Sequence, residues 1–380
     1  MSPVGPRRRA LVVSLRMAPG LAKEFVTLGE HLRSQGWEVR FLVASGYRGR
    51  LPAGFDTDGL TYLDVPESRA RAFATKWGPL PAILGDLIGS EPFDYVTCYN
   101  PHPLNARLMG VLRRHSPRSR RSVVLHEPWV PWAERRRYGW LGMLKLLAVD
   151  FFSYTLLREC TDVVLPSAYA QTLYGQRPLT RRRVQQHVVP LCIPDLPDGR
   201  QAHTEPPADP YLCFVGTINP ARRVDDVFTV AQALHDSHLG VSVKVLTRQS
   251  VSTQVPNVDV ITRETISDDD ISELVGGALA LFLPHTAASQ SGNVPVAFRV
   301  ATPILAFDIP GLAQHVRTGE TGVLMRRDHL AEDVVRAVEY VLSHNLRPGC
   351  RQAYEAQFAP ATLQARYAWL TGEPGGVSDG

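Results

Sequence analysis

The stretch "YLCFVGTINPARRVDDVFTVAQALHDSHLGVSVKVLT" (residues 211–247) contains the pattern that decides the fold. Two apolar runs, 211–218 and 241–247, have the length of buried strands. Between them, residues 224–236 carry apolar side chains at helical spacing. A strand, a helix and a second strand in this order form the unit from which parallel sheets are built. The stretch therefore predicts an α/β protein with a helix-covered parallel sheet.

The same alternation repeats along the rest of the chain. Before the quoted stretch we expect strands at 9–15, 37–44, 62–66, 93–100, 122–128, 161–167 and 184–194. Helices are expected at 22–36, 79–89, 103–115 and within the apolar segment 138–160. After the stretch we expect strands at 279–284, 303–308 and 322–326, helices at 266–278, 293–301 and 311–319, and a helical segment over 329–370. Two such arrays predict two doubly wound, Rossmann-like domains.

A proline-rich segment separates the two arrays. Residues 194–210 hold five prolines and show no apolar periodicity, which is typical of a linker. We therefore expect an N-terminal domain at 1–193 and a C-terminal domain at 211–360, with residues 361–380 forming a helix that crosses back and a tail. Because ligands of such sheets bind beyond the carboxyl ends of the strands, we expect a cleft lined by loops of both domains.

Composition excludes several classes of protein. With 44% hydrophobic and 21% charged residues the chain can form a core, and its net charge of +4 is too small to indicate nucleic acid binding. Most basic residues are arginines, clustered at Arg7–Arg9, Arg113–Arg121 and Arg135–Arg137. These clusters are either solvated basic surfaces or contacts for an anionic lipid or a phosphorylated acceptor.

Cysteine usage and apolar runs bear on location. The five cysteines are scattered and form no Cys-x-x-Cys pair, which favours reduced cytoplasm over a disulfide framework or a zinc site. The run "LVVSL" (residues 11–15) indicates a first strand rather than a signal peptide. Segment 138–157 is interpreted as a packing helix of the first domain, with a membrane-surface helix as the alternative; Lys145 and Asp150 disfavour a spanning helix.

Two loops are candidates for anion binding. Gly216 follows a strand and permits close approach of a ligand, and Arg222 and Arg223 precede a helix, where two guanidinium groups suit a diphosphate. In the second loop Ser291, Gly292 and Asn293 open a helix whose N–H groups favour an anion. A surface arginine pair and simple helix capping are the alternatives for the two loops. The run Asp268–Asp270 is better explained by helix capping than by a metal site.

At these residues the chain resembles the retaining GT-B glycosyltransferases of the sucrose-synthase and mannosyltransferase group. The family pattern G-x-I-x-x-x-K-G-x-D falls on Gly216, Ile218, Arg222, Arg223 and Asp225, with Arg222 in place of the lysine and Thr217 in place of a frequent arginine. The segment "SQSGNVPVAFRVATPILAFD" (289–308) resembles an "SQSG" branch of this group. The resemblance implies a donor diphosphate site that includes Gly216, Thr217, Arg222, Arg223, Ser291, Gly292 and Asn293.

The chain departs from the family at two glutamates. Their positions fall on Ser289 and Ala297, so the carboxylates that usually contact the sugar hydroxyls and the ribose are missing. Ser289 and Gln290 are the residues expected to contact the donor sugar instead. The departure leaves the sugar and the base of the donor open.

The first half matches the family more loosely. "RMAPGLAKEF" (16–25) resembles a first loop in which a glycine, here Gly20, lets the backbone approach the donor. "VVLHEPW" (123–129) resembles a strand-end motif whose histidine, here His126, faces the transferring sugar, and Glu127 stands beside it. A histidine next to a carboxylate suits proton handling, although a structurally satisfied histidine is the alternative.

Together these patterns predict a cytoplasmic hexosyltransferase, with peripheral contact to a membrane surface left open. We expect transfer with retention from a UDP-, GDP- or dTDP-sugar to a hydroxyl of a specialised metabolite or an envelope glycan or lipid. His126 and Arg222 are the expected catalytic residues, and the resemblance implies neither a metal nor another cofactor. The alternatives are an inverting GT-B transferase, a sugar-nucleotide 2-epimerase and an inactive nucleotide-sugar-binding partner subunit.

Overall fold

The computed structural model describes residues 7–16, 19–52, 54–65, 82–89, 92–178, 184–197, 202, 204–219 and 221–370. The chain divides into two compact units. The first comprises Met1–Cys192 and Pro360–Gly380, and the second comprises Ile193–Ala359. The domain boundaries expected from the sequence, 1–193 and 211–360, stay a prediction.

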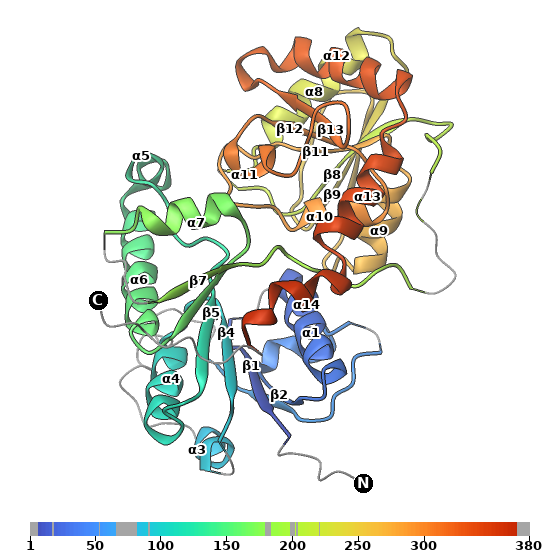
Figure 1. Ribbon diagram of the computed structural model, residues 1–380. Coiled ribbons are helices and arrows are strands. Elements are labelled where there is room, and N and C mark those ends of the chain that lie inside the picture. Colours follow the sequence, from blue (N-terminus) through green and yellow to red (C-terminus); the bar gives the residue numbers. More distant parts are fainter. Residues whose placement is uncertain are drawn as a thin grey trace, which may run out of the picture. The chain divides into compact units, whose positions relative to one another are not determined.

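The first unit is built on a seven-stranded sheet in which every strand pair is parallel (Figure 1). Its strand order is β3-β2-β1-β4-β5-β6-β7. The strands are β1 (Arg9–Ser14), β2 (Glu38–Ala44), β3 (Leu60–Leu63), β4 (Tyr95–Tyr99), β5 (Arg120–Val124), β6 (Asp162–Leu165) and β7 (Gln185–Val188). This order reverses direction between β1 and β4, and in doubly wound sheets ligands commonly bind beyond the carboxyl ends of the strands at such a reversal.

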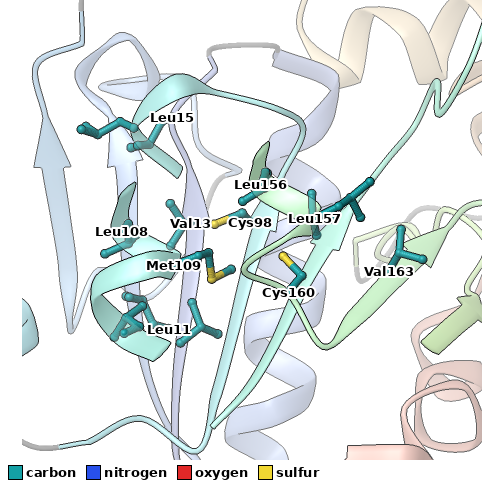
Figure 2. Close-up of a cluster of buried hydrophobic side chains, with 14 of the residues drawn as sticks. Leu11, Val13, Leu15, Cys98, Leu108, Met109, Leu156, Leu157, Cys160 and Val163 are labelled. Atoms are coloured by element: carbon teal, nitrogen blue, oxygen red, sulfur yellow. The ribbon is translucent and has the colours of Figure 1, made fainter. Parts of the chain in front are cut away.

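Helices cover both faces of this sheet. They are α1 (Pro19–Ser34), α3 (Ala82–Gly89), α4 (Pro103–His115), α5 (Trp132–Arg135), α6 (Gly139–Leu157) and α7 (Ala168–Gly175), with short 3₁₀ turns η1 (Ser45–Tyr47) and η2 (Arg136–Tyr138). Alternate residues of β1 point to opposite cores: Leu11 and Val13 lie with side chains of α4 and α6, whereas Ala10 and Val12 lie with α1. Figure 2 shows the first of these cores, where Leu156 lies beside Cys98.

The end of the described chain packs into the first unit. Pro360–Leu370 forms the short turns η4 (Pro360–Thr362), α14 (Leu363–Arg366) and η5 (Ala368–Leu370). Trp369 stacks on His187 with ring centroids 3.9 Å apart, meets Tyr95 edge to face at 5.9 Å, and lies under the Arg120 guanidinium at 4.9 Å. These contacts attach the C-terminal segment to the strands β4, β5 and β7.

The second unit repeats the architecture with a six-stranded parallel sheet of order β10-β9-β8-β11-β12-β13. The strands are β8 (Tyr211–Val215), β9 (Ser242–Thr247), β10 (Val258–Thr262), β11 (Ala280–Leu283), β12 (Ile304–Phe307) and β13 (Gly322–Met325). The helices are α8 (Val224–Asp236), α9 (Asp268–Gly276), α10 (Asn293–Arg299), α11 (Pro310–Ala313), α12 (Leu330–Ser343) and α13 (Arg347–Gln357), with the turn η3 (Arg327–His329). Helices α8 and α12 pack together in one core, and α9, α10 and α13 line the other (Figure 1).

The expected α/β class with two Rossmann-like sheets is confirmed, and several local predictions are wrong. Strand β10 was not expected, because its five residues VDVIT lie half-exposed at the sheet edge and Asp259 interrupts the apolar run. The helix expected at 311–319 is only the four-residue α11. The segment expected to be helical over 329–370 is interrupted repeatedly, and the strand expected at 184–194 is limited to β7. Residues 79–81 of an expected helix lie outside the described residues.

We predict that Trp369→Ala lowers the stability of the first unit by about 2 kcal/mol, since a half-buried tryptophan loses its stacking and packing contacts. Thermal unfolding of the full chain, followed by calorimetry, measures the change. Trp140→Ala serves as the matched control, because Trp140 is 69% exposed. Its removal should change the free energy of unfolding by less than about 0.5 kcal/mol. Equal shifts in the two variants would contradict the role assigned to Trp369.

Candidate functional site

The two candidate loops of the second unit meet at the point where its strand order reverses. The order changes direction between β8 and β11, and these strands are paired in register, with Leu281 beside Cys213. Gly216 directly follows β8, and His285 follows β11 by two residues. Carboxyl ends of neighbouring parallel strands at such a reversal form the usual ligand crevice of a doubly wound sheet.

Backbone pairing joins the two loops directly. Asn219 and Arg222 form an antiparallel bridge that closes a tight turn, and Arg222 forms a second antiparallel bridge with His285. The Thr286 N–H donates to the Ala221 carbonyl at 2.9 Å. The arginine loop is therefore held against the segment that leads to residues 289–293.

Gly216 and Arg222 lie against each other. Gly216 has a φ of 130°, a conformation that residues with a Cβ rarely adopt, and a Cβ there would meet Arg222 Nη1 at 2.9 Å. Arg222 is half-buried, whereas the Arg223 side chain is 46% exposed and pairs with Asp225 at 3.1 Å. Of the two arginines, Arg222 is therefore the one that the loop directs over the end of β8.

Gln249, which the sequence analysis did not identify, supports the same loop. Its Oε1 accepts from the Ile218 N–H at 2.6 Å, and its Nε2 donates to the Ile218 carbonyl at 3.0 Å. A glutamine that satisfies both backbone groups of one residue holds that residue as a strand partner would. Thr217 lies between these fixed positions and is exposed.

His285 is a deeply buried polar side chain next to this loop. It is only 3% exposed, and burial together with the neighbouring positive charge of Arg222 lowers its pKa to about 3. A weak interaction with the Leu283 carbonyl acts in the opposite direction. Neither ring nitrogen makes a hydrogen bond of ordinary geometry with the described part of the chain. A neutral imidazole here keeps Arg222 as the positive group of the crevice.

Asn293 connects the second loop to β8. Its Nδ2 donates to the Val215 carbonyl at 2.9 Å, and its N–H approaches Ser291 Oγ at 3.4 Å. The Asn293 amide therefore fixes the start of α10 over the end of β8. Ser291 is buried and Gly292 is exposed, so the backbone around Gly292 is the accessible part of this predicted anion site.

Gly311 accounts for the shape of the loop before α10. A Cβ at Gly311 would lie 1.9 Å from the Ala288 carbonyl oxygen, so only glycine allows α11 to approach the loop so closely. Gln314 Nε2 donates to the Ser289 carbonyl at 3.2 Å. Ser289 is 6% exposed and Gln290 is half-buried. Of the two residues expected to contact the sugar, Gln290 is the more accessible.

The two family glutamate positions have different surroundings. Ser289 lies in the loop described above, whereas Ala297 is fully buried in the core shared by α10 and α13. The methyl group of Ala297 packs among apolar side chains, so a carboxylate at this position would be buried in this arrangement. In this chain the second position at which the resemblance implies a glutamate is therefore a core position.

In the first unit His126 follows β5 by two residues, and its side chain reaches groups that follow β1 and β4, the two strands between which the strand order reverses. Its Nε2 is 2.6 Å from Glu24 Oε2 of α1, and its Nδ1 is 3.1 Å from Asn100 Oδ1 after β4. The carboxylate partner expected from the sequence was Glu127, but Glu127 is exposed and Glu24, 102 residues away, takes this place. Both ring nitrogens therefore lie within hydrogen-bonding distance of side chains from other elements, which fixes the orientation of the ring.

Other groups around His126 are also fixed. Asn100 adopts a φ of 61°, a left-handed conformation that asparagine tolerates better than most residues, and its carbonyl accepts from Asn105 Nδ2 at 3.0 Å. His102 caps α4, and burial with help from Arg16 lowers the pKa of His102 to about 4.

Gly20 was expected in a loop but lies in the first turn of α1, and a Cβ there would meet no atom within 4 Å.

Among the described residues, no group of three or more His, Cys, Asp or Glu side chains is placed so that it could hold a metal ion. The run Asp268–Asp270 opens α9 as predicted. Asp270 and Ser267 form a capping box, in which the Ser267 hydroxyl and backbone lower the pKa of Asp270.

Comparison with known proteins places this architecture in the GT-B fold class. No protein-family model matches the chain, and no curated protein matches it in sequence. Solved structures match along nearly its whole length at low sequence identity, and these neighbours are GT-B glycosyltransferases.

Three neighbours illustrate the similarity. The pneumococcal O-GlcNAc transferase GtfA, solved with UDP and GlcNAc, has a TM-score of 0.69 and 9% identity over 96% of this chain and 99% of its own. Sucrose-phosphate synthase from Thermosynechococcus elongatus has a TM-score of 0.67 and 13% identity over 96% and 99%. WaaG, a glycosyltransferase of lipopolysaccharide biosynthesis, has a TM-score of 0.66 and 15% identity over 96% and 100%. At these identities the similarity establishes the fold.

We predict that His285 makes the second unit sensitive to acid. The unfolded chain takes up a proton near the ordinary histidine pKa of 6.5, while the folded chain does so only at about 3. Between these values the unfolded state binds more protons, so stability is lost as the pH falls, by up to roughly 3 kcal/mol at about pH 4.

Calorimetry of the wild type and of His285→Leu at pH 7 and at about pH 4.5 tests this prediction. His285→Leu should lose less stability on acidification than the wild type, because the buried ring no longer titrates. His235→Gln, which changes an exposed histidine of α8, should behave as the wild type does. Identical losses in His285→Leu and the wild type would contradict the prediction.

Proposed function

We propose that the chain is a glycosyltransferase that moves a hexosyl group from a nucleoside diphosphate sugar to a hydroxyl acceptor. The observation that carries the proposal is the bridge between Arg222 and His285, which joins the two candidate loops at the strand reversal of the second sheet. The GT-B fold and the neighbour solved with UDP and GlcNAc support the same class of donor.

The proposed donor site uses the groups around the end of β8. Gly216 lets the guanidinium of Arg222 approach the strand end, and the accessible backbone at Gly292 lies on the loop bridged to it. Thr217, Arg223, Ser291 and Asn293 complete the proposed diphosphate site; the Asn293 side chain acts through its bond to Val215 rather than by direct contact. Ser289 and Gln290 are proposed for the sugar.

The reaction follows from the charge on the donor. As the bond between the anomeric carbon and the diphosphate oxygen breaks, its electron pair remains on the diphosphate, and the acceptor oxygen forms the new bond and loses its proton. Arg222 stabilises the negative charge that develops, which is worth most where water is excluded. Retention at the anomeric carbon and independence of metal ions are part of the proposal and follow from the family resemblance.

His126 is proposed as a residue of the acceptor side. Glu24 and Asn100 contact both of its ring nitrogens, so the ring is oriented to exchange one of these contacts for a substrate hydroxyl. The role of Gly20 is reduced to allowing a ligand to approach α1, because no protein atom requires a glycine there.

A nucleotide-sugar-binding subunit without activity is the second candidate, favoured by the buried Ala297 and the missing carboxylates. We predict that at least one of UDP, GDP and dTDP raises the melting temperature of the chain, since a ligand at about 100 times its Kd stabilises the native state by about 2.7 kcal/mol. Differential scanning fluorimetry measures the shift. A chain that none of the three nucleotides stabilises would contradict both candidates.

We predict that Arg222→Ala lowers kcat/KM by at least ~10²-fold, because the developing charge loses its principal cation. Arg222→Lys should retain part of the activity, since lysine keeps the charge without the two-pronged geometry. Arg263→Ala is the matched control: Arg263 is an exposed arginine of the same unit that pairs with Asp270. Nucleotide release from the donor measures turnover. Unchanged kinetics in Arg222→Ala would remove Arg222 from the mechanism, and nucleotide binding without turnover in the wild type would favour the subunit.

A further inference from the structure

Large apolar side chains are exposed on one segment of the first unit. Of ten such exposed side chains in the described residues, nine lie between Trp132 and Phe151, and the tenth is Leu342 of α12. Helix α6 was expected to pack inside its domain, yet only 17% of its apolar window is buried. An exposed apolar patch of this extent is typical of a binding surface.

The exposed residues form a continuous stripe on α6. Trp140, Leu144, Leu147 and Phe151 follow each other at spacings of four, three and four residues, which places them on one face of the helix, and each is 42% to 69% exposed. We call these four residues the α6 stripe. The C-terminal end of the same helix is attached to the core: Leu156 and Leu157 are buried beside Cys98 and Cys160 (Figure 2).

A buried arginine fixes the middle of the helix. Arg135 is 1% exposed and lies between the rings of Trp129 and Trp132, with its Cζ 3.9 Å and 4.6 Å from their centroids. Its Nη2 donates to Asp150 Oδ2 at 2.7 Å, which joins α5 to the middle of α6. The C-terminal end and the middle of α6 are therefore held by the first unit, and the stripe extends from this attached part of the helix toward its start.

The charges around the stripe are mainly positive. Arg136 precedes α6, Lys145 lies on it and Arg158 follows it, and all three are exposed. The acidic residues of the same stretch are each less exposed, and the carboxylate of Asp150 is already paired with Arg135. A second copy of the chain would bring the same positive charges against this surface, whereas anionic lipid headgroups complement them.

The distribution of residues suits a helix that lies in the membrane interface. Helix α6 is long and apolar enough to span a bilayer by length and composition. Spanning would, however, pull Leu156 and Leu157 out of the core and bury the Lys145 ammonium in hydrocarbon. Tyr138 and Trp140 at its start are residue types that favour the headgroup region.

We propose that the α6 stripe docks the first unit onto the surface of an anionic lipid bilayer, with α6 parallel to the membrane and its flanking cations among the headgroups. The apolar side chains enter the acyl boundary, and Arg136, Lys145 and Arg158 supply the electrostatic attraction. Five residues separate His126 from Trp132, so docking brings the His126 loop close to the membrane surface. The proposal concerns binding alone and does not depend on the proposed transferase reaction.

Co-sedimentation of the full chain with vesicles tests this proposal. The vesicles contain phosphatidylcholine alone or with about 30% phosphatidylglycerol, at low salt and at about 0.5 M NaCl. We expect binding to the anionic vesicles at low salt, and at least about tenfold weaker binding with the neutral vesicles or at high salt. Leu144→Glu/Phe151→Glu should bind at least about tenfold more weakly than the wild type, whereas Leu342→Glu, the matched exposed leucine, should bind as the wild type does.

A second variant distinguishes a loss of membrane binding from a loss of folding. Arg136→Glu/Lys145→Glu leaves the stripe apolar and should lower binding to anionic vesicles alone, while circular dichroism and light scattering monitor the folding and mass of every variant. The proposal is overturned if the wild type does not bind anionic vesicles, or if the double glutamate variant of the stripe binds as well as the wild type. Binding that withstands high salt and alkaline carbonate would indicate a spanning helix, and a dimer lost only in the stripe variant would indicate a second copy; either result also overturns it.

Discussion

The antiparallel bridge between Arg222 and His285 is the interaction on which the candidate donor site depends. It joins a loop that follows β8 to a loop that follows β11, and so brings together two residues that are 63 positions apart in the sequence. The bond from Asn293 to the Val215 carbonyl adds a second connection between the same two strand ends. With both in place, the backbone is arranged before any ligand arrives, which reduces the ordering cost of binding.

The electrostatics of this site follow from burial. Arg222 lies over a glycine and beside an imidazole whose pKa burial holds far below the usual value, so the histidine adds no competing charge at neutral pH. Ser289 and the buried Ala297 place no carboxylate at these two positions of the loop and of α10. The resulting crevice presents one directed cation and accessible backbone near Gly292, which is the arrangement that an anionic ligand requires.

The sequence predicts local features of this chain far better than contacts between distant segments. Apolar runs and helical spacing located nearly all strands and the helix that begins at Val224, because these signals depend on neighbours in the chain. The partners of His126 could not be read in this way: Glu24 and Asn100 belong to α1 and the β4 loop and meet His126 only when the sheet forms. Gln249 and Asn293 are similar, since their role is to satisfy backbone groups of another loop. Helix α6 had the apolar character of a core helix, and only the fold shows that its outer face is exposed.

A crystal structure of the chain with UDP, GDP or dTDP, whichever binds, would test the central claim most directly. The account predicts that the diphosphate lies between the Gly216–Arg222 loop and the backbone of Ser291–Gly292, with the Arg222 guanidinium within hydrogen-bonding distance of a phosphate oxygen. A nucleotide bound elsewhere in the second unit, with Arg222 directed away from it, would contradict the account.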